Sequence, residues 1–386
     1  MAIAPRAIAP STHFLFQREI GIVLLVLFLS RVFFFGVAWL GLQVNTEQSV
    51  KPHPDAFSQS QVWSSFIRWD SYHLYDVAVR GYQSDALYRT AFFPLYPVLS
   101  RVIGNAWQNV WVAGLLVSYL SFFIGGVLSY LIARNFLQKR DALFALVLIS
   151  FFPAAFFYSA WYTESLFFCV SAAALLAHLR HHRWLAIFFA VLALFARPVG
   201  VGLVATLCII EIVAWVKRRR ITLGDVLWIA SVFIASTLLI LFYYIVSGDG
   251  FAFLHSQGWW GHRLSDPITS MLRSAYALIT QADIFGRGEL LIATLLSIPT
   301  LLFALWGLRE KRIPFALTLY SFFVVLLPML GGHLYSFTRY ILLAFPLAYF
   351  AALKIQSAWI RSLLLFLLLF FGGLTTFAFT HWQWAG

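Results

Sequence analysis

The chain has 386 residues, of which 61% are apolar and only 11% carry a charge, and its mean hydropathy is +0.83. A soluble core cannot bury that much apolar surface, so the composition excludes an ordinary soluble protein and predicts that the surplus faces lipid. The formal net charge of +12 does not indicate a nucleic-acid partner, because Lys and Arg stand in short clusters between apolar runs.

Apolar stretches divide the chain from one end to the other. Most are long enough to cross about 30 Å of hydrocarbon as a helix. We therefore predict an all-α polytopic membrane protein with about eleven transmembrane helices. The stretch 184–197 is the shortest and ends at Arg197-Pro198, so a broken span is the alternative there. The predicted spans are 20–42, 111–133, 141–158, 164–179, 184–197, 199–216, 226–246, 289–308, 313–330, 339–353 and 359–380.

The positions of Lys and Arg orient these spans. If residues 1–19 are a cytoplasmic N-terminus, every connection assigned to the inside carries two or more basic residues, and the short outside connections carry few. The long connections 43–110 and 247–288 then lie outside. They are rich in Trp, Tyr, His, Asp and Arg, which favours functional loops over disordered ones. We expect one transmembrane domain over 1–386, with its chemistry on the extracytoplasmic side.

Three further features concern the spans and the first loop. Arg31 lies in the middle of the first span, where a charge is costly unless it is paired, and a carboxylate on the outer side is the partner we expect. Cys169 and Cys208 lie in apolar runs, so neither a disulfide framework nor a Cys-based zinc site is available. Residues 66–80 predict a helix in the plane of the membrane interface with its aromatic side chains toward lipid.

The densest group of polar and aromatic residues begins at Arg68. Asp70 is a candidate general base, because transfer of a sugar from a phosphate needs a base beside the acceptor hydroxyl, whereas the leaving phosphate needs only cations. The alternative is that Asp70 caps a helix N-terminus. For His73 we favour a structural hydrogen bond, and for Asp76 an i,i+4 ion pair with Arg80. The cations considered for the phosphate are Arg68, Arg89, Arg197, Arg263 and Arg339.

Other candidates stand near the outer ends of predicted spans. Glu164 either complements the dipole of the following helix or hydrogen-bonds to sugar hydroxyls. Arg197 is a cation where the positive-inside rule disfavours one, which favours a phosphate contact over a structural ion pair. Gln257 precedes Trp259 and Trp260, which fit either an aromatic belt or stacking on a sugar. The histidines of these groups lack the spacing of a zinc site, so no metal is expected there.

Five blocks of sequence follow one another in an order known from one protein family. The first block, RWDSYHLYDVAVRGY followed by AFFPLYPVL, is the most specific. The others are FFPAAFFYSAWYTESLF, ARPVG, QGWWG and SFTRYILLAFP. Together they resemble the PIG-V-like mannosyltransferases, the GPI mannosyltransferase II family, over roughly residues 20–350.

The resemblance implies a GT-C-type fold, in which a bundle of membrane helices carries amphipathic helices in its first outer loop. It also implies a polyprenyl-phosphate-mannose donor and inversion at the anomeric carbon. An acidic residue in the first outer loop is taken as catalytic in such families, and that role falls on Asp70. We expect the donor phosphate to meet Arg197 and Arg339, with Arg68 and Arg263 as further candidates. The substrate-binding candidates are Trp69, His73, Phe93, Pro94, Glu164, Gln257 and Trp260.

These expectations define a function and its alternatives. We expect a monomeric mannosyltransferase with a glycolipid or glycan acceptor, in a bacterial plasma membrane because no endoplasmic reticulum retention signal ends the chain. No cofactor is expected, since the outer loops carry no Gly-rich phosphate loop or DxD pair, although a divalent ion at Asp70 stays open. The alternatives are a GT-C transferase for another polyprenyl-phosphate sugar and a transporter or flippase, against which the lack of an inverted repeat in the sequence argues.

Overall fold

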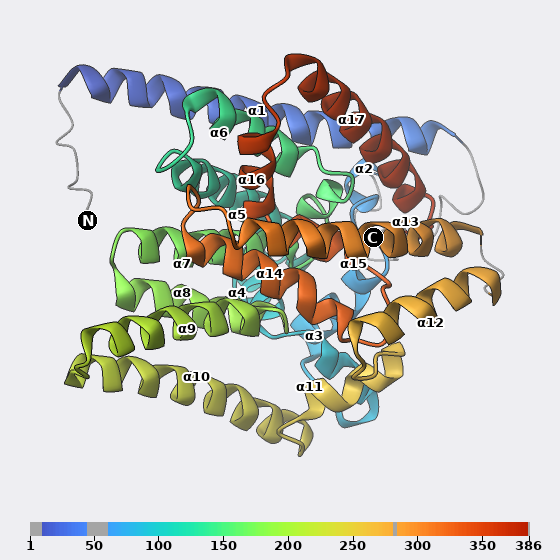
Figure 1. Cartoon of the computed structure of the whole chain (residues 1–386). Coiled ribbons are helices and arrows are strands. Elements are labelled where there is room, and N and C mark those ends of the chain that lie inside the picture. The colour runs from blue at the N-terminus through green and yellow to red at the C-terminus, as the bar shows by residue number, and fades with distance from the viewer. Residues whose placement is uncertain (1–9, 45–60, 281–283, 385–386) are drawn as a thin grey trace.

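The computed structural model describes residues 10–44, 61–280 and 284–384. Within these ranges every regular element is helical, which confirms the predicted all-α class. Apolar membrane segments fold as helices because a helix satisfies its own backbone N–H and C=O groups where water is absent. The elements, shown in Figure 1, are α1 (Pro10–Gln43), α2 (Gln61–Ser64), α3 (Asp70–Arg80), η2 (Ser84–Ala91), α4 (Leu95–Trp107), α5 (Val110–Ala133), α6 (Lys139–Ser150), η3 (Ala155–Tyr158), α7 (Glu164–Leu179), α8 (Arg183–Ala196), α9 (Gly200–Arg218), α10 (Leu223–Ser247), α11 (Ala252–His255), η4 (Ser256–Trp260), α12 (Pro267–Thr280), α13 (Ile284–Gly307), α14 (Phe315–Met329), α15 (Phe337–Leu343), α16 (Pro346–Lys354) and α17 (Ala358–Thr380).

Among the described residues, six helices are long and apolar enough to cross a bilayer, or seven if the bent pair α15 and α16 counts as one span. The axes of this pair differ by 75°. The six candidate spans lie in α1, α5, α9, α10, α13 and α17. The structure therefore supports a polytopic integral membrane protein, but the predicted count of eleven spans is not confirmed.

Three shorter apolar helices, α7, α8 and α14, coincide with the predicted spans 164–179, 184–197 and 313–330. They contain 16, 14 and 15 residues. At 1.5 Å per residue, a 14-residue helix reaches about 21 Å, less than the hydrocarbon thickness of a bilayer. Most side chains of α7 are buried, and its neighbours are α5 and α8. A helix enclosed by other helices need not match the thickness of the bilayer.

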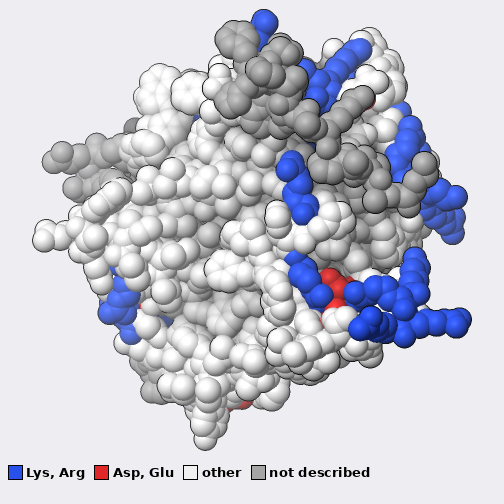
Figure 2. Space-filling model, turned by 90° about the vertical axis from the view of Figure 1, so that its left-hand side faces the viewer, with Lys and Arg blue, Asp and Glu red and all other residues white. Residues whose placement is uncertain are grey.

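Basic residues gather at one end of the bundle, which we call the basic end. The turns that join α7 to α8 and α9 to α10 lie at the left in Figure 1, and Figure 2, which faces that side, shows much more Lys and Arg than Asp and Glu. One buried carboxylate neutralises part of this charge: Oδ1 of Asp225 lies 2.9 Å from Nη1 of Arg183 and 3.3 Å from Nη2 of Arg218. This ion pair ties the ends of three helices together.

Arg31 is buried inside α1, but the expected carboxylate partner is wrong. Its Nη1 donates to the carbonyl of Ala155 at 2.8 Å and to Oγ of Ser159 at 2.9 Å, and Nη2 donates to the carbonyl of Ser150 at 3.0 Å. The guanidinium also lies 4.2 Å from the ring centroid of Phe122. The carbonyl of Ser150 is available because Ser150 is the last residue of α6, and the last carbonyls of a helix lack intrahelical partners.

The two long connections meet at the end of the bundle away from the basic end, and we call their common layer the loop end (Figure 1). The carbonyl of Ala252 in α11 accepts a hydrogen bond from Oγ1 of Thr90 in η2 at 2.9 Å. The ring of Trp260 in η4 lies 5.2 Å from that of His73 in α3. Segments of the predicted loops 43–110 and 247–288, far apart in sequence, thus form one structure.

The helix expected at 66–80 is α3, which begins later than predicted. Its buried residues are Ser71, Leu74, Val77 and Ala78. This spacing places one face of α3 against the bundle, where its neighbours are α4 and α5. Tyr75 stacks on Trp111 with centroids 3.8 Å apart, and Tyr72 stacks on Trp382 at 5.7 Å. These aromatic side chains therefore pack on the protein and not toward lipid as expected.

Candidate functional site

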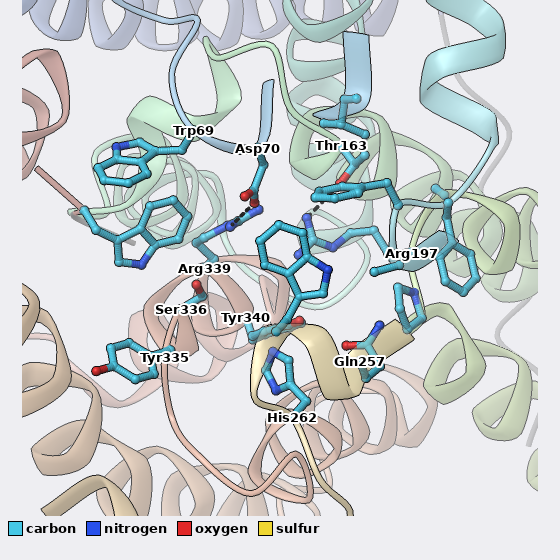
Figure 3. A pocket seen from close by; sticks show the side chains of 18 of the residues that line it. Trp69, Asp70, Thr163, Arg197, Gln257, His262, Tyr335, Ser336, Arg339 and Tyr340 are labelled. Carbon is cyan, nitrogen blue, oxygen red and sulfur yellow. Dashed lines mark hydrogen bonds and ion pairs between the residues drawn. The ribbon is translucent and has the colours of Figure 1, made fainter. Parts of the chain in front are cut away.

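A cavity of about 420 Å³ lies at the loop end, enclosed by both long connections and by ends of the bundle helices (Figure 3). Rings form much of its wall and a few charged groups converge in it, which is the usual character of a ligand site. Three of the predicted charged residues line it: Asp70, Arg197 and Arg339. The other lining residues are Trp69, Leu74, Ala91, Phe92, Phe93, Thr163, Ala196, Pro198, Gln257, Trp260, His262, His333, Tyr335, Ser336, Tyr340 and Trp384.

Asp70 is the first residue of α3, and its carboxylate points to Arg339 across the cavity wall (Figure 3). The side chain is 23% exposed, and Oδ2 lies 3.1 Å from Nη1 of Arg339. The N-cap position belongs to Trp69, so the alternative role of Asp70 as the cap is not the one observed. A carboxylate that binds one arginine keeps lone pairs that can accept a proton from a hydroxyl.

The turn before α3 is strained. Trp69 has φ 52° and ψ −115°, a conformation that bulky residues avoid at a cost of about 1–3 kcal/mol. The hydroxyl of Tyr162 bridges this turn, because it accepts from the N–H of Asp70 at 3.2 Å and donates to the carbonyl of Arg68 at 3.0 Å. Tyr162 is fully buried. The bundle therefore holds the strained turn, and with it the direction of the Asp70 carboxylate.

Glu164 lies beneath the two arginines of the cavity. Its Oε1 is 2.7 Å from Nη1 of Arg197 and 2.5 Å from Nη2 of Arg339, and its side chain is fully buried. A shared carboxylate allows two guanidinium groups to approach each other, because it offsets their mutual repulsion. Glu164 thus lies behind the arginines and outside the cavity wall. The sequence left two roles open for it, contact with sugar hydroxyls and interaction with the helix dipole, and its place as the first residue of α7 agrees with the second.

The Arg197-Pro198 sequence explains why a cation faces the cavity. Proline disfavours a helical residue before it, and Arg197 is extended with φ −156° and ψ 150°, so α8 ends there. The next helix starts at Gly200, where a Cβ would lie 2.4 Å from the carbonyl oxygen of Ala193. This tight turn keeps the guanidinium of Arg197 near Thr163, whose Oγ1 accepts from Nη1 at 2.8 Å.

Arg339 is oriented by a second left-handed residue. Ser336, with φ 64°, precedes α15, and its N–H donates to Oε1 of Glu289 at 3.0 Å. The guanidinium of Arg339 lies 4.8 Å from the ring centroid of Phe157 and 4.9 Å from that of Tyr162. Aromatic faces and two carboxylates therefore fix this arginine, which is only 7% exposed.

Two histidines in the cavity wall form a stacked pair that joins the second long loop to the segment before α15. The rings of His262 and His333 have centroids 4.2 Å apart and an interplanar angle of 29°. Burial, followed by the neighbouring His333, lowers the pKa of His262 to about 4, and burial also lowers the pKa of His333. Next to this pair the N–H of Arg263 donates to the carbonyl of Gly331 at 3.0 Å.

His73 lies behind the cavity wall in an aromatic cluster. Its ring stacks on Phe92 at 5.3 Å and meets the edge of Trp260 at 5.2 Å, and burial lowers its pKa. Nε1 of Trp260 donates to the carbonyl of Tyr88 at 3.1 Å, which fixes this indole in the wall. Trp259 is 77% exposed and outside the cluster. The two neighbouring tryptophans therefore have different surroundings.

Three more predicted residues lie outside the cavity wall. Arg68 is buried and donates from Nη1 to the carbonyls of Ser64 and Ile67, and burial lowers its pKa to about 10. Arg263 is exposed. Pro94 is buried and directly precedes α4. Arg68 therefore binds backbone carbonyls, Arg263 lies on the surface, and Pro94 packs at the start of α4.

Asp76 pairs as predicted with Arg80, at 4.0 Å between Oδ1 and Nε. It also pairs more closely with Arg89, whose Nη2 lies 2.7 Å from Oδ2. Arg89 was a candidate for the phosphate, but this pair holds it to α3.

Sequence reasoning missed several residues that shape the site. Tyr162 holds the strained turn before α3, Glu289 accepts a hydrogen bond from the N–H of Ser336 before α15, and Trp384 lines the cavity from the segment after α17. No local pattern singles out Trp384, because a tryptophan just beyond an apolar span is typical of the membrane-interface belt.

Comparison with known proteins gives one partial similarity. Over 141 residues the chain is 27% identical to the protein named GPI mannosyltransferase 2 of Schizosaccharomyces pombe. The match covers 36% of this chain and 30% of the length of that relative. No family model matches the chain, and no solved structure matches it. The similarity supports a relationship to mannosyltransferases. It agrees with the resemblance of the five sequence blocks at that level and no finer.

Proposed function

We propose that the protein is a membrane-embedded glycosyltransferase of GT-C type, which transfers mannose from a polyprenyl-phosphate donor to a hydroxyl of a glycolipid or glycan. One observation carries the proposal: the carboxylate of Asp70 and the guanidinium groups of Arg197 and Arg339 line the same cavity at the loop end. A base for a hydroxyl and cations for a phosphate are what this reaction requires. The partial similarity to GPI mannosyltransferase 2 supports the same class of reaction.

The orientation follows from charge. Basic connections favour the cytoplasmic side of a membrane. With the basic end in the cytoplasm, the cavity opens on the extracytoplasmic side, where a lipid-linked donor presents its sugar. We take a plasma membrane of bacterial type as the location.

In the proposed reaction, the acceptor oxygen forms a bond to the anomeric carbon of mannose while the bond from that carbon to the phosphate oxygen breaks. The electron pair of the broken bond leaves with the polyprenyl phosphate, and the hydroxyl proton passes to Asp70. Attack opposite the leaving group inverts the anomeric configuration. The growing negative charge on the phosphate is stabilised by Arg197 and Arg339, which the shared Glu164 holds in place before substrate binds.

Neutral side chains complete the site. Gln257 offers an amide to sugar hydroxyls, and the rings of Phe93 and Trp260 lie in the wall beside it. No cofactor takes part in the proposed steps, because the leaving phosphate needs cations and not a proton.

The test uses purified protein in detergent with synthetic polyprenyl-phosphate-mannose and a lipid extract as acceptor, and measures release of polyprenyl phosphate. Asp70→Asn should lower turnover by about 10²–10⁴-fold, the range typical of a lost general base. Asp76→Asn is the matched control, because Asp76 lies on the same helix but pairs with Arg89. Turnover of Asp70→Asn near that of the wild type would discard the base. Parallel assays with glucosyl and arabinofuranosyl donors separate mannose from other polyprenyl-phosphate sugars.

A further inference from the structure

The segment that follows α17 folds back across the loop end. Trp382 has φ 60°, and the N–H of Gln383 donates to the carbonyl of Ala378 at 3.0 Å. A left-handed residue just after a helix reverses the direction of the chain. This reversal brings Trp384 to the cavity, whereas α17 itself packs along α1.

Trp382 anchors this segment on the first long loop. Its ring stacks on Tyr72 of α3 with centroids 5.7 Å apart and an interplanar angle of 11°. The guanidinium of the buried Arg68 lies 4.7 Å from the ring centroid of Trp382. Contacts of this kind add about 0.5–1.5 kcal/mol each to simple burial. These contacts therefore hold the segment after α17 in a defined position on the first long loop.

Trp384 and Trp69 together form an aromatic corner of the cavity. Their centroids are 5.7 Å apart, and the planes meet at 84°. Trp69 directly precedes Asp70, and the guanidinium of Arg339 lies 5.5 Å from the ring centroid of Trp384. Trp69 is 37% exposed, which leaves part of its surface accessible to a ligand. The corner thus adjoins the proposed base and one proposed phosphate ligand.

We propose that Trp384, with Trp69 at its edge, is the surface on which the transferred sugar ring lies, and that this surface selects pyranosyl over furanosyl donors. The inference rests on the proposed function. A sugar whose phosphate meets Arg339 and whose acceptor hydroxyl meets Asp70 lies over this ion pair, and Trp384 lines the cavity beside Arg339. A pyranose presents a flat patch of C–H groups to an indole, whereas a puckered furanose presents a smaller one.

A purely structural role for Trp384 has a different consequence. If its ring only supports the guanidinium of Arg339, its loss weakens every donor to the same extent, because all donors share the phosphate. A sugar platform instead changes the ratio between donors. The ratio of kcat/KM for a pyranosyl and a furanosyl polyprenyl phosphate therefore separates the two roles.

The experiment compares Trp384→Phe with Trp384→Leu. Both side chains are apolar, but only phenylalanine keeps a flat aromatic face. Trp359→Ala is the control, because Trp359 is 72% exposed at the other end of α17. Each purified variant is assayed with mannosyl and arabinofuranosyl polyprenyl phosphates, and its melting temperature shows whether it is folded.

Trp384→Phe should stay within a few-fold of the wild type, and Trp384→Leu should raise KM for the mannosyl donor about tenfold or more and reduce the pyranose preference. Rescue by Phe but not Leu supports the platform. An unchanged donor ratio in Trp384→Leu, with an active wild type, overturns this inference and leaves the proposed function intact. A wild type that uses no lipid-phosphate sugar overturns both.

Discussion

Oε1 of Glu164 accepts a hydrogen bond from Nε of Arg339 at 2.6 Å and lies 2.5 Å from Nη2 of the same guanidinium as an ion pair. The same oxygen lies 2.7 Å from Nη1 of Arg197. One buried carboxylate therefore organises both cations of the cavity, while the second carboxylate, Asp70, meets Arg339 from the cavity side. This division separates a structural acid from a proposed catalytic one.

Removal of the structural charge should destabilise the fold. Glu164→Gln keeps the shape of the side chain but leaves two buried guanidinium groups without their shared counter-ion, which typically costs about 3–5 kcal/mol. Thermal unfolding in detergent should show a lower melting temperature. Asp249→Asn, which breaks the exposed pair with His255, is the control and should change little. Equal melting temperatures for the two variants would contradict the assigned role of Glu164.

Loss of Arg197 or Arg339 should weaken binding of the donor more than binding of the acceptor. A hydrogen bond to a charged group contributes about 1.5–3 kcal/mol, so Arg197→Gln and Arg339→Gln should each raise KM for polyprenyl-phosphate-mannose about tenfold to a hundredfold. Steady-state kinetics with each substrate varied in turn measures this difference. Arg263→Gln, at an exposed position outside the cavity wall, should leave the donor KM near that of the wild type. Equal effects on donor and acceptor would argue against phosphate contact.

Stability should fall with pH on the acidic side because of the stacked histidines. The pKa of His262 is about 4 in the folded protein and 6.5 without its environment, so between these values the unfolded chain binds more protons. The contribution of His262 to the free energy of unfolding is complete above about pH 6.5 and is lost as pH falls toward 4. Melting temperatures measured from pH 7.5 to 4.5 should decline in the wild type. His262→Phe keeps a ring against His333 and should flatten the decline; a slope identical to that of the wild type would refute the assignment.

Close packing at α5 predicts a strong effect of a single methyl group. A Cβ at Gly114 would lie 1.9 Å from Nε1 of Trp161, a buried indole that donates to the carbonyl of Trp111 at 3.0 Å. Gly114→Ala should therefore cost about 1–3 kcal/mol or more, seen as a lower melting temperature. The matched control is Gly36→Ala in α1, where nothing lies within 4 Å, and helix propensity should raise stability slightly. A Gly114→Ala protein as stable as Gly36→Ala would show that α5 and Trp161 are packed less closely.

Local chemistry and motif resemblance point to Asp70, Arg197 and Arg339, and all three line one cavity, while their catalytic and binding roles stay predictions. The count of eleven spans is not confirmed. Span prediction counts apolar length, and it cannot tell a helix that lipid surrounds from a short one, such as α8, that packs between other helices.

By itself the sequence determined that this is an all-helical membrane chain with two long connections between its apolar stretches, because apolar length, basic clusters and helix-breaking prolines are local properties. Only the tertiary structure decided which charges meet. Glu164 and Arg339 are 175 positions apart, and Asp70 and Arg339 are 269 apart, and no local pattern encodes such pairs. The position of Trp384 in the cavity wall is also decided by tertiary structure. It depends on how the segment after α17 packs against α3, and packing of distant segments is a property of the whole fold.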